Sequence, residues 1–580
     1  MDNLTSGQVQ YEERTHDDDE LRLPVDHEPA ALTIDVVDKF NIGFTPVDLG
    51  GRPLLDLSNT GGWPAALFIF CNETANNMVA TGVLSSMLFY MYYEMHISLP
   101  KANVIMNNWF GANGLLSLFG GFIADAYLGR YYTICIFSVI YVLGLLLSTL
   151  TSVVAGLKPS SSGCGVVALY LGTCTQASTT QMFVLYLSLY TIALGLGGIR
   201  PCLSTFGADQ FDMENPKEKL QLARFFNWYY LAFTLGSVFS ATLVVFLYTS
   251  VSWAWAFGCL TIAMALANLL FLLGTPLYRH HLPSGSPLTR LLQVLVASTR
   301  KWRVQVPDDE SLLYEVHDKE SAIVGSRRLH HVHDLRFFDK AAVQIEEEQK
   351  STSVQAPNPW KLCTVTQVEE LKAIVRLIPT WACTIIVTTL AFQILFVSAG
   401  QTLTMDRRIG SFIVPPQSFA VGFCQLIICV LVTYDLVMVP LMRHYTSNPR
   451  GISILQRIGI GIFLSIVAAV ASAVIERQRR KVSWETITAE NPNATVPFSV
   501  WWLLIPLTIA GLAETTVTIG QLDLFYQEVP DSIRSLGAGF VATASGIGAF
   551  LGSLLLSVTN RITSRNGKNP WVDDIISIGH

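Results

Sequence analysis

Charged residues are scarce in this chain. Only 14% of its 580 residues are Asp, Glu, Lys or Arg, whereas 51% are hydrophobic and the mean hydropathy is +0.42. A soluble globular protein carries roughly 25% charged residues, so the composition indicates a polytopic membrane protein instead. The apolar segments are long and continuous, which excludes a porin-like barrel built from short alternating strands.

Several sequence signatures are missing as well. The acidic N-terminus (HDDDE, 16–20) has no apolar core of a signal peptide, so the first span is expected to target the chain. The ten cysteines form no CxxC pair and no Cys/His cluster with metal spacing, and no cofactor is expected. Because the chain has no nucleophile elbow, P-loop or His-x-x-x-x-Asp pattern, an enzyme is the weakest interpretation.

Eleven apolar runs are long enough to cross a hydrocarbon core of about 30 Å as helices. The long polar stretch 276–371 separates six of them from the other five. This is the six-plus-six plan of many transporters with the twelfth helix missing. The predicted spans are 64–92, 102–123, 132–156, 180–199, 226–248, 253–274, 373–398, 418–442, 452–475, 498–520 and 537–558.

The placement of Lys and Arg predicts the orientation. The stretch 276–371 is rich in both, so it and the N-terminus are predicted to be cytosolic, although the basic loop 477–481 breaks the rule. The linker either contains helices, at 286–302 on the membrane surface and at 334–350, or is simply solvated. The expected parts are a cytosolic N-terminal segment (1–60), an N-terminal six-helix bundle (61–275), the cytosolic linker (276–371), a C-terminal bundle (372–558) and an outer tail that suggests truncation (559–580).

Two features fall on the outer side in this orientation. Cys164 and Cys174 lie in one outer segment, where a disulfide bond and two free thiols are both open. The sequon Asn493-Ala-Thr495 is also outside, and the sequence leaves its glycosylation open.

Two charges lie within apolar spans. Arg200 is near the end of the Gly-rich segment that begins at Tyr190, and a cation at membrane depth costs about 2.5–3.5 kcal/mol on insertion scales. Such a residue normally faces a polar cavity and has an anionic partner. Glu514 lies inside the last but one span, where a charge is likewise costly and indicates either a function or a satisfied structural hydrogen bond.

A gate motif connects the second and third spans. The segment GGFIADAYLGRYYT (120–133) resembles the G-x-x-x-D-x-x-G-R pattern of the major facilitator superfamily. Asp125 and Arg130 are predicted to form a charge network on the cytosolic face, while Gly121 and Gly129 permit close packing and a tight turn.

Further segments resemble the plant nitrate/peptide transporter family, which belongs to the proton-dependent oligopeptide transporters of the same superfamily. The resemblance covers roughly residue 60 to the C-terminus. It implies a central pocket, alternating access and transport of nitrate, peptides, hormones or specialised metabolites with protons. The segments include FGADQFD (206–212), FFNWYYLAFTLGS (225–237), NPWKLCTVTQVEELK (358–372) and GQLDLFYQEVPDSIRSLG (520–537).

The chain departs from this family at its first-span E-x-x-E-R motif. Glu73 is retained, but Asn76 and Asn77 replace the second Glu and the Arg, and Arg200 replaces the fourth-span Lys. Positions i, i+3 and i+4 share one helix face, so this face stays polar but loses two charges. Because Glu73 and Arg200 still sum to zero, Glu73 is the predicted partner of Arg200. The alternative is that Glu73 faces another span and Arg200 meets the lipid headgroups.

The resemblance also bears on the pocket, where it places Glu514 and implies that this residue holds a substrate amine or a gating cation. Nitrate carriers of the family use a seventh-span histidine, and the matching residue is Ala391, which argues against the usual nitrate site. A larger organic solute is therefore expected. Six polar or aromatic residues are further pocket candidates, with ordinary packing as the alternative. They are Asn108, Trp109, Asn227, Trp228, Gln393 and Trp502.

Three functional interpretations remain open beside the enzyme. The first is a proton-coupled secondary transporter in which Glu73, Glu514 or both carry the proton. The Asn pair favours a proton-independent facilitator or exporter, and the missing span favours a non-transporting sensor or an inactive truncated member. The expected partners are a small-molecule solute, protons and the lipid bilayer of a plasma or vacuolar membrane, with no nucleic acid. The sequence sets neither the substrate nor the oligomeric state.

Overall fold

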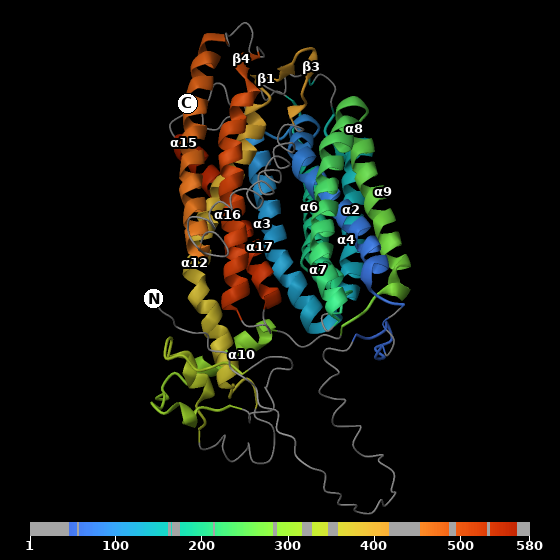
Figure 1. Ribbon diagram of the computed structural model, residues 1–580. Helices are drawn as coiled ribbons and strands as arrows, with labels where there is room; N and C mark the ends of the chain where they lie inside the picture. Colours follow the sequence, from blue (N-terminus) through green and yellow to red (C-terminus); the bar gives the residue numbers. More distant parts are fainter. Residues whose placement is uncertain are drawn as a thin grey trace, which may run out of the picture. The chain divides into compact units, whose positions relative to one another are not determined.

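The computed structural model describes residues 46–54, 57, 59–160, 164, 174–212, 215–281, 287–315, 328–345, 358–416, 453–486, 495–529 and 534–564. Long helices dominate this part of the chain (Figure 1). Ten of the eleven predicted spans are helical here, whereas the run 418–442, Asn493 and the tail from 565 lie outside the described residues. Eight described helices are long and apolar enough to cross a membrane. The prediction of an all-α, multi-pass membrane protein is confirmed.

The N-terminal half consists of long helices around an apolar core. Helix α2 packs against α7 and α9, and α4 packs against α6 and α9. Helix α7 continues through a π-helical turn, η3 (Ser240–Val244), into α8 (Val245–Ser250). The long helices are α2 (Gly62–Tyr93), α3 (Leu99–Ile123), α4 (Arg130–Val153), α6 (Thr179–Ala208), α7 (Pro216–Phe239) and α9 (Trp253–Leu273). Two short turns, η1 (Ala124–Leu128) and η2 (Ala155–Leu157), flank α4.

The described C-terminal half contains four long helices. They are α12 (Val365–Gln401), α15 (Ile454–Thr486), α16 (Leu504–Glu528) and α17 (Arg534–Thr563). Short strands follow α12: β1 (Met405–Asp406) pairs in parallel with β4 (Val496–Ser499), and β2 (Arg408–Ile409) pairs antiparallel with β3 (Phe412–Ile413). A 3-10 turn, η8 (Val500–Leu503), leads into α16.

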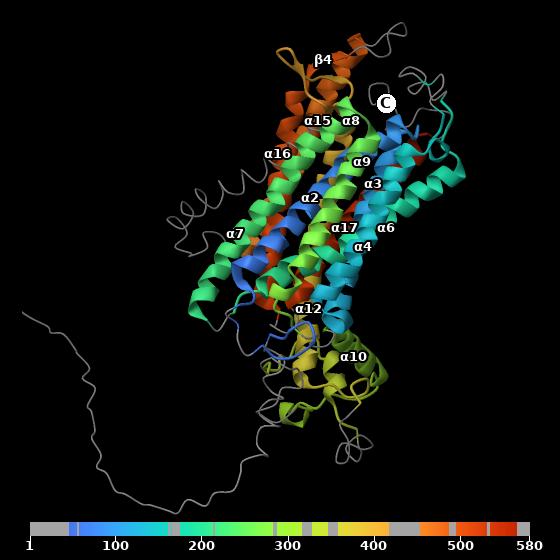
Figure 2. The ribbon, with the colours of Figure 1, turned by 90° about the vertical axis from the view of Figure 1, so that its right-hand side faces the viewer.

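The two halves meet along α3 and α17, which lie side by side between the helices of each half (Figures 1 and 2). Gly114 of α3 faces Gly546 of α17, and a Cβ added at Gly114 would lie 2.6 Å from the carbonyl oxygen of Ala542. Small residues allow two membrane helices to approach this closely. The contact surface between the halves therefore depends on glycine.

Capping boxes start two of the helices that bear on the site. At α6, Ser178 Oγ accepts a hydrogen bond from the Gln181 N–H (3.3 Å), and Gln181 Oε1 accepts one from the Ser178 N–H (2.9 Å). Thr364 and Gln367 make the same pair of bonds at α12. Each box satisfies two backbone donors that a helix start otherwise leaves open.

The linker is partly helical, as one of the two alternatives predicted. Helix α10 (Pro287–Arg300) occupies the expected position, but its apolar face packs on the protein: Leu291, Val294 and Ala297 share a buried core with Ala341 and Leu371. The prediction that this helix lies on the membrane surface is wrong for its apolar face, because that face packs against apolar residues of α12 and η6. The described part of the second expected helix, 334–345, contains only the 3-10 turn η6 (Phe338–Ala342). Two further 3-10 turns are η4 (Thr275–Leu277) and η5 (Glu310–Leu312).

Candidate functional site

Glu73 lies at the centre of a buried polar group between α2 and α7. Its side chain is 4% exposed and is hydrogen-bonded to the side chains of Tyr229 of α7 and Asn76 of its own helix. A buried carboxylate needs partners of this kind, because burial without hydrogen bonds is costly. The polar face that the sequence predicts on α2 therefore points at α7.

Asn77 binds α7 as well. Its amide nitrogen donates to the carbonyl oxygen of Phe233 and to Ser237 Oγ, both at 2.6 Å. Gly236 lies between these two partners, and its Cα faces the α2 backbone at Thr74 so closely that an added Cβ would overlap the Thr74 carbonyl oxygen. The glycine thus brings α7 near enough for both the Asn77 and the Glu73 hydrogen bonds.

Arg200 reaches the same group from α6. It is exposed, and it lies within electrostatic range of Glu73, Tyr229 and Tyr141. No ion pair of 4.0 Å or less joins Arg200 to Glu73 among the described contacts. The structure therefore brings the two predicted residues into one electrostatic group and leaves the guanidinium accessible to a further anion.

Glu514 lies on α16, in the other half of the protein. Its side chain is partly buried and has no hydrogen bond or ion pair to any residue that the structure describes. Asp523, on the same helix, is instead paired with Arg457 at 3.1 Å. Of these two acids, Asp523 is therefore ion-paired within the described part of the chain and Glu514 is not.

The other pocket candidates occupy different environments. Trp109 is buried and its indole N–H donates to the Leu189 carbonyl oxygen of α6 at 3.0 Å, so this ring packs within the N-terminal half. Ala391 is buried, and Gln393 on the same helix directs its amide toward Gly552 of α17. Trp502 is exposed and stacks on Phe498.

Two of the remaining candidates are described. Asn108 is half-buried on α3, and Trp228 is exposed on α7. The side chain of Asn227 lies outside the described part of the chain.

The gate motif forms a charge network, as predicted. Arg130 Nη1 lies 2.5 Å from Asp209 Oδ2, and Arg130 Nε lies 3.7 Å from Asp125 Oδ1. Gly129 makes the tight turn with φ of 77°. The close approach predicted for Gly121 belongs instead to Gly120, where an added Cβ would lie 2.5 Å from the Gly197 carbonyl oxygen.

The structure also accounts for the spacing of this motif. Three residues separate Asp125 from Gly129, one more than the G-x-x-x-D-x-x-G-R pattern contains. The segment Ala124–Leu128 forms a π-helical turn, which takes more residues per turn than an α-helix. The extra residue is absorbed there, and Arg130 still reaches its partners.

Sequence reasoning missed a second charge network, centred on Arg279. This side chain is buried and lies 2.8 Å from Glu218 Oε2, and it donates to the Gln210 carbonyl oxygen at 3.1 Å. Burial raises the pKa of Glu218, but the hydrogen bonds from Arg279 and from the Asp212 N–H, together with the Arg279 charge, lower it overall. The network fixes the FGADQFD segment to the end of α9.

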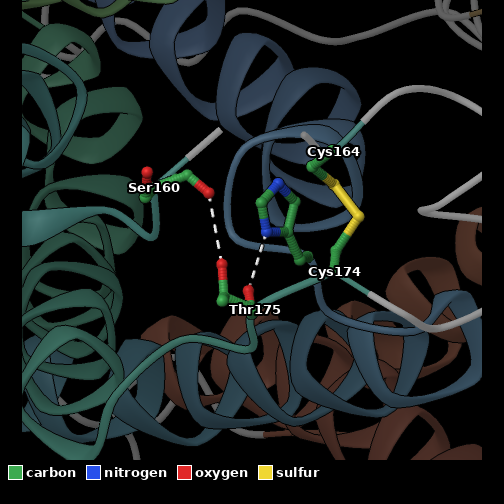
Figure 3. Close-up of a disulfide and its surroundings, with 5 residues drawn as sticks. Ser160, Cys164, Cys174 and Thr175 are labelled. Atoms are coloured by element: carbon green, nitrogen blue, oxygen red, sulfur yellow. Dashed lines mark hydrogen bonds between the residues drawn. A yellow bond between two sulfur atoms is a disulfide. The ribbon is translucent and has the colours of Figure 1, made fainter. Parts of the chain in front are cut away.

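The outer segment contains the disulfide that the sequence left open. Cys164 and Cys174 are bonded, and Figure 3 shows the bridge beside Thr175 and Ser160. The Thr175 hydroxyl donates to the Ser160 carbonyl oxygen at 3.2 Å, and its own carbonyl oxygen accepts from His96 Nδ1 at 2.8 Å. These bonds tie the disulfide to the segment that joins α2 to α3.

Tyr141 and Tyr229 were also missed, although both surround Glu73. Aromatic residues in membrane helices are usually packing residues, so their presence carries no signal by itself. For Tyr229 the position within FFNWYYLAF, opposite the Glu73 face, was the available clue. Together the long apolar helices, the buried carboxylate and the accessible guanidinium define a multi-pass membrane protein with charged side chains inside its N-terminal half.

Comparisons with known proteins identify the family. The family model described as PTR2, POT family, matches residues 131–572. Protein NRT1/PTR FAMILY 6.1 of Arabidopsis thaliana is 41% identical over 93% of this chain and 86% of its own length. Protein NRT1/PTR FAMILY 8.5 of the same plant is 39% identical over 98% of this chain and 94% of its own. The chain belongs to the POT family, which confirms the predicted resemblance.

Solved structures agree on the fold. The in meso crystal structure of the POT family transporter PepTSo matches with a TM-score of 0.61 at 18% identity, over 87% of this chain and 91% of that one. A POT family transporter in complex with 5-aminolevulinic acid matches with a TM-score of 0.56 at 12% identity, over 87% and 94%. These identities are low, so the matches support the fold alone.

Proposed function

We propose that this protein is a proton-coupled secondary transporter for a small organic solute that carries a carboxylate. The solute's anionic end binds Arg200, and its transport is coupled to a proton on Glu73. The observation that carries the proposal is that Arg200 is accessible and lies in the electrostatic field of Glu73 without being paired to it directly.

The coupling follows from electrostatics. An ionised Glu73 competes with the solute for the positive charge of Arg200. Protonation removes this competition, and the Tyr229 and Asn76 contacts keep the neutral carboxyl in place. The solute and the proton therefore favour each other's binding, as reciprocal linkage between two sites requires.

Glu514 supplies the negatively charged end of the proposed binding site, opposite Arg200. It lies in the other half and has no described partner, so it is free to bind an ammonium group. A zwitterion would then bridge Arg200 and Glu514, and its binding would favour closure of the two halves around it. Dipeptides have both charged groups, and so does 5-aminolevulinic acid, the molecule in complex with one of the POT transporters of similar fold.

The test is uptake into proteoliposomes with an imposed pH gradient. Wild-type uptake of a labelled dipeptide or 5-aminolevulinic acid should rise when the outside is acidic. Glu73→Gln should abolish the dependence on the gradient while leaving solute exchange at equal pH measurable. Glu514→Gln should weaken uptake of zwitterions by at least tenfold, and Asp523→Asn, on the same helix but outside the pocket, should leave it unchanged.

The runner-up is a facilitator or exporter that needs no proton. The observation in its favour is that Asn76 and Asn77 occupy the positions of two charged family residues, and Asn77 is engaged in helix packing. Wild-type flux that does not change with the pH gradient, yet is lost in Arg200→Gln, would establish this alternative. Absence of flux for every solute tested would favour a sensor.

A further inference from the structure

A buried polar cluster lies where the cytosolic linker meets the base of α12. His331 precedes η6, Asp339 belongs to η6, and Glu369 and Lys372 lie in the first two turns of α12. The side chains of His331, Asp339 and Glu369 are only 9%, 1% and 3% exposed. Nothing in the proposed transport site uses these residues.

Donor atoms of three residues converge in this cluster. His331 Nε2 lies 3.2 Å from Asp339 Oδ2, and one ligand atom from each of His331, Asp339 and Glu369 lies within 4.8 Å of the other two. Tetrahedral zinc sites with metal–donor distances of about 2.0–2.1 Å place their donors roughly 3.3 Å apart. One pair thus already has this spacing, and Glu369 needs only a small side-chain movement.

Most of the donor atoms in this cluster have no hydrogen bond of good geometry. Lys372 Nζ lies 2.6 Å from Asp339 Oδ1 and 2.8 Å from Glu369 Oε1, so it engages one oxygen of each carboxylate. The second oxygens, Asp339 Oδ2 and Glu369 Oε2, and both His331 ring nitrogens are buried without a hydrogen bond of good geometry. Buried polar atoms are normally satisfied, and a bound ion is one way to satisfy them.

We propose that His331, Asp339 and Glu369 bind a divalent transition-metal ion of the zinc class. Imidazole and carboxylate donors suit such ions. Asp339, Glu369 and Glu310 carry three negative charges against the two positive charges of Lys372 and Arg376, whose Nη2 lies 4.0 Å from Glu369 Oε2, so a cation improves the local charge balance. Three protein ligands leave a fourth position to water.

The surroundings of His331 support the assignment. Its other ring nitrogen, Nδ1, lies 3.3 Å from Glu310 Oε1. Histidine ligands commonly donate this second N–H to a carboxylate, which fixes the tautomer and orients the ring. Glu310 also lies 3.1 Å from His333 Nε2, but His333 is largely exposed and belongs to a second, surface arrangement of three residues, Glu310, His331 and His333.

The consequence concerns the linker. The three ligands come from the loop before η6, from η6 itself and from the start of α12. A bound ion therefore fixes the linker to this helix, whose far part carries Phe392 in contact with Phe110 of α3 at a ring distance of 4.3 Å. Metal occupancy would link the cytosolic segment to the interface between the halves.

The experiment is calorimetric titration of Zn²⁺ into the purified full-length protein in detergent, after treatment with EDTA. One equivalent should bind to wild type, and Co²⁺ in its place should give the absorption of a four-coordinate site. His331→Ala and Glu369→Gln should each weaken binding by at least tenfold. His333→Ala is the matched control and should bind as wild type does.

Two measurements guard against misfolding. Size-exclusion profiles of the metal-free variants should match wild type, and Zn²⁺ should raise the melting temperature of wild type and His333→Ala but not of His331→Ala. Binding that is lost in His333→Ala but retained in Glu369→Gln would move the ion to the surface arrangement and overturn the proposal. Absence of stoichiometric binding to wild type, or equal binding by all variants, would do the same.

Discussion

Asn77 uses its side-chain amide to hold helices α2 and α7 together. Its two hydrogen bonds, to Phe233 and Ser237, are both 2.6 Å long and buried. A guanidinium at this position would bring an additional charge into the Glu73 group. The neutral amide adds no charge beside Glu73 and Arg200, and it contributes two hydrogen bonds to the packing of α2 on α7.

The first prediction concerns this contact. Asn77→Ala should lower the free energy of unfolding by about 1–2 kcal/mol, because the Ser237 hydroxyl and the Phe233 carbonyl lose a buried partner. A double-mutant cycle with Ser237→Ala, measured by thermal or chemical unfolding in detergent, should give a coupling of about 0.6–1.7 kcal/mol. Strictly additive effects would show that the hydrogen bond contributes nothing.

The second prediction is a pH dependence outside the membrane. The folded pKa of Glu218 lies below its ordinary value of 4.5, so its ionised form stabilises the folded protein above that value. The stabilisation is lost as the pH falls from 4.5 through the folded pKa. Glu218→Gln should therefore cost about 1–3 kcal/mol near pH 7, and the difference from wild type should shrink as the pH falls below 4.5.

The matched control for Glu218 is Asp308→Asn. Asp308 also pairs with an arginine, Arg336, but it is 96% exposed. Exposed pairs contribute little, so this variant should differ from wild type by less than about 0.5 kcal/mol at any pH. Equal losses in the two variants would argue against the buried network.

At the scale of single residues, the sequence predicts the charged residues of the site but not the uncharged side chains beside them. Glu73, Arg200 and Arg130 stand out because a charge in or beside an apolar run is costly. Tyr141 and Tyr229 do not stand out, since aromatic residues are common in such helices. The His331 cluster was hidden for another reason: its members are separated by eight to thirty residues of polar linker, where charged residues need no explanation.

At the scale of the helices, the close approach of α7 to α2 depends on Gly236, which has no side chain. Gly236 faces the α2 backbone between Thr74 and Met78, where a Cβ would lie 2.8 Å from the Met78 nitrogen. Protein interiors do not absorb such an overlap without backbone movement. The distance between the two helices is therefore set at this residue, and with it the geometry around Glu73.

The third prediction follows. Gly236→Ala should destabilise the protein by about 1–3 kcal/mol and reduce solute uptake, because α7 must move away from Glu73. Gly258→Ala on α9 is the control, since an added Cβ there has no atom within 4 Å; it should be neutral or slightly stabilising. Unfolding curves and uptake assays on the same preparations would separate the two variants.

The hydropathy of the sequence predicts where the helices cross the membrane but not where they begin and end. The predicted span 373–398 is part of α12, which begins eight residues earlier at the Thr364–Gln367 capping box. The predicted span 452–475 overlaps α15, which is described from Ile454 and continues to Thr486 through the basic stretch. There Arg479 is fully buried and bonds both oxygens of Glu476, so the residues that broke the charge rule belong partly to an ion-paired helix.

For the whole molecule, the disulfide and the linker lie at opposite ends of the predicted topology. Cys164 and Cys174 follow α4 on its outer side, and disulfides persist in oxidising surroundings. The basic linker is predicted to face the cytosol. Together the disulfide and the linker predict which end of each intervening helix faces the outer side of the membrane.

The fourth prediction tests this orientation in cells. In Cys174→Ser, the freed Cys164 should react with a membrane-impermeant maleimide on intact cells if the protein resides in the plasma membrane. His333→Cys, an exposed position of the linker, should react only after permeabilisation. Labelling in the opposite order would invert the topology, and protection of both positions until permeabilisation would indicate a vacuolar membrane.

The length of helix α12 determines how far a tilt at its N-terminal end displaces residues near its other end. With 37 residues the helix is about 55 Å long, and Phe392 lies about 40 Å from its N-terminal start at Val365. A tilt of about 5° at that start carries the Phe392 ring about 3.5 Å, roughly the thickness of an aromatic ring. Pro379 interrupts the backbone hydrogen bonds between the two ends and offers a place to bend. If the helix stays straight at Pro379, a tilt at the linker end therefore shifts Phe392 against Phe110 of α3 by about one ring thickness, and a bend at Pro379 would absorb that shift.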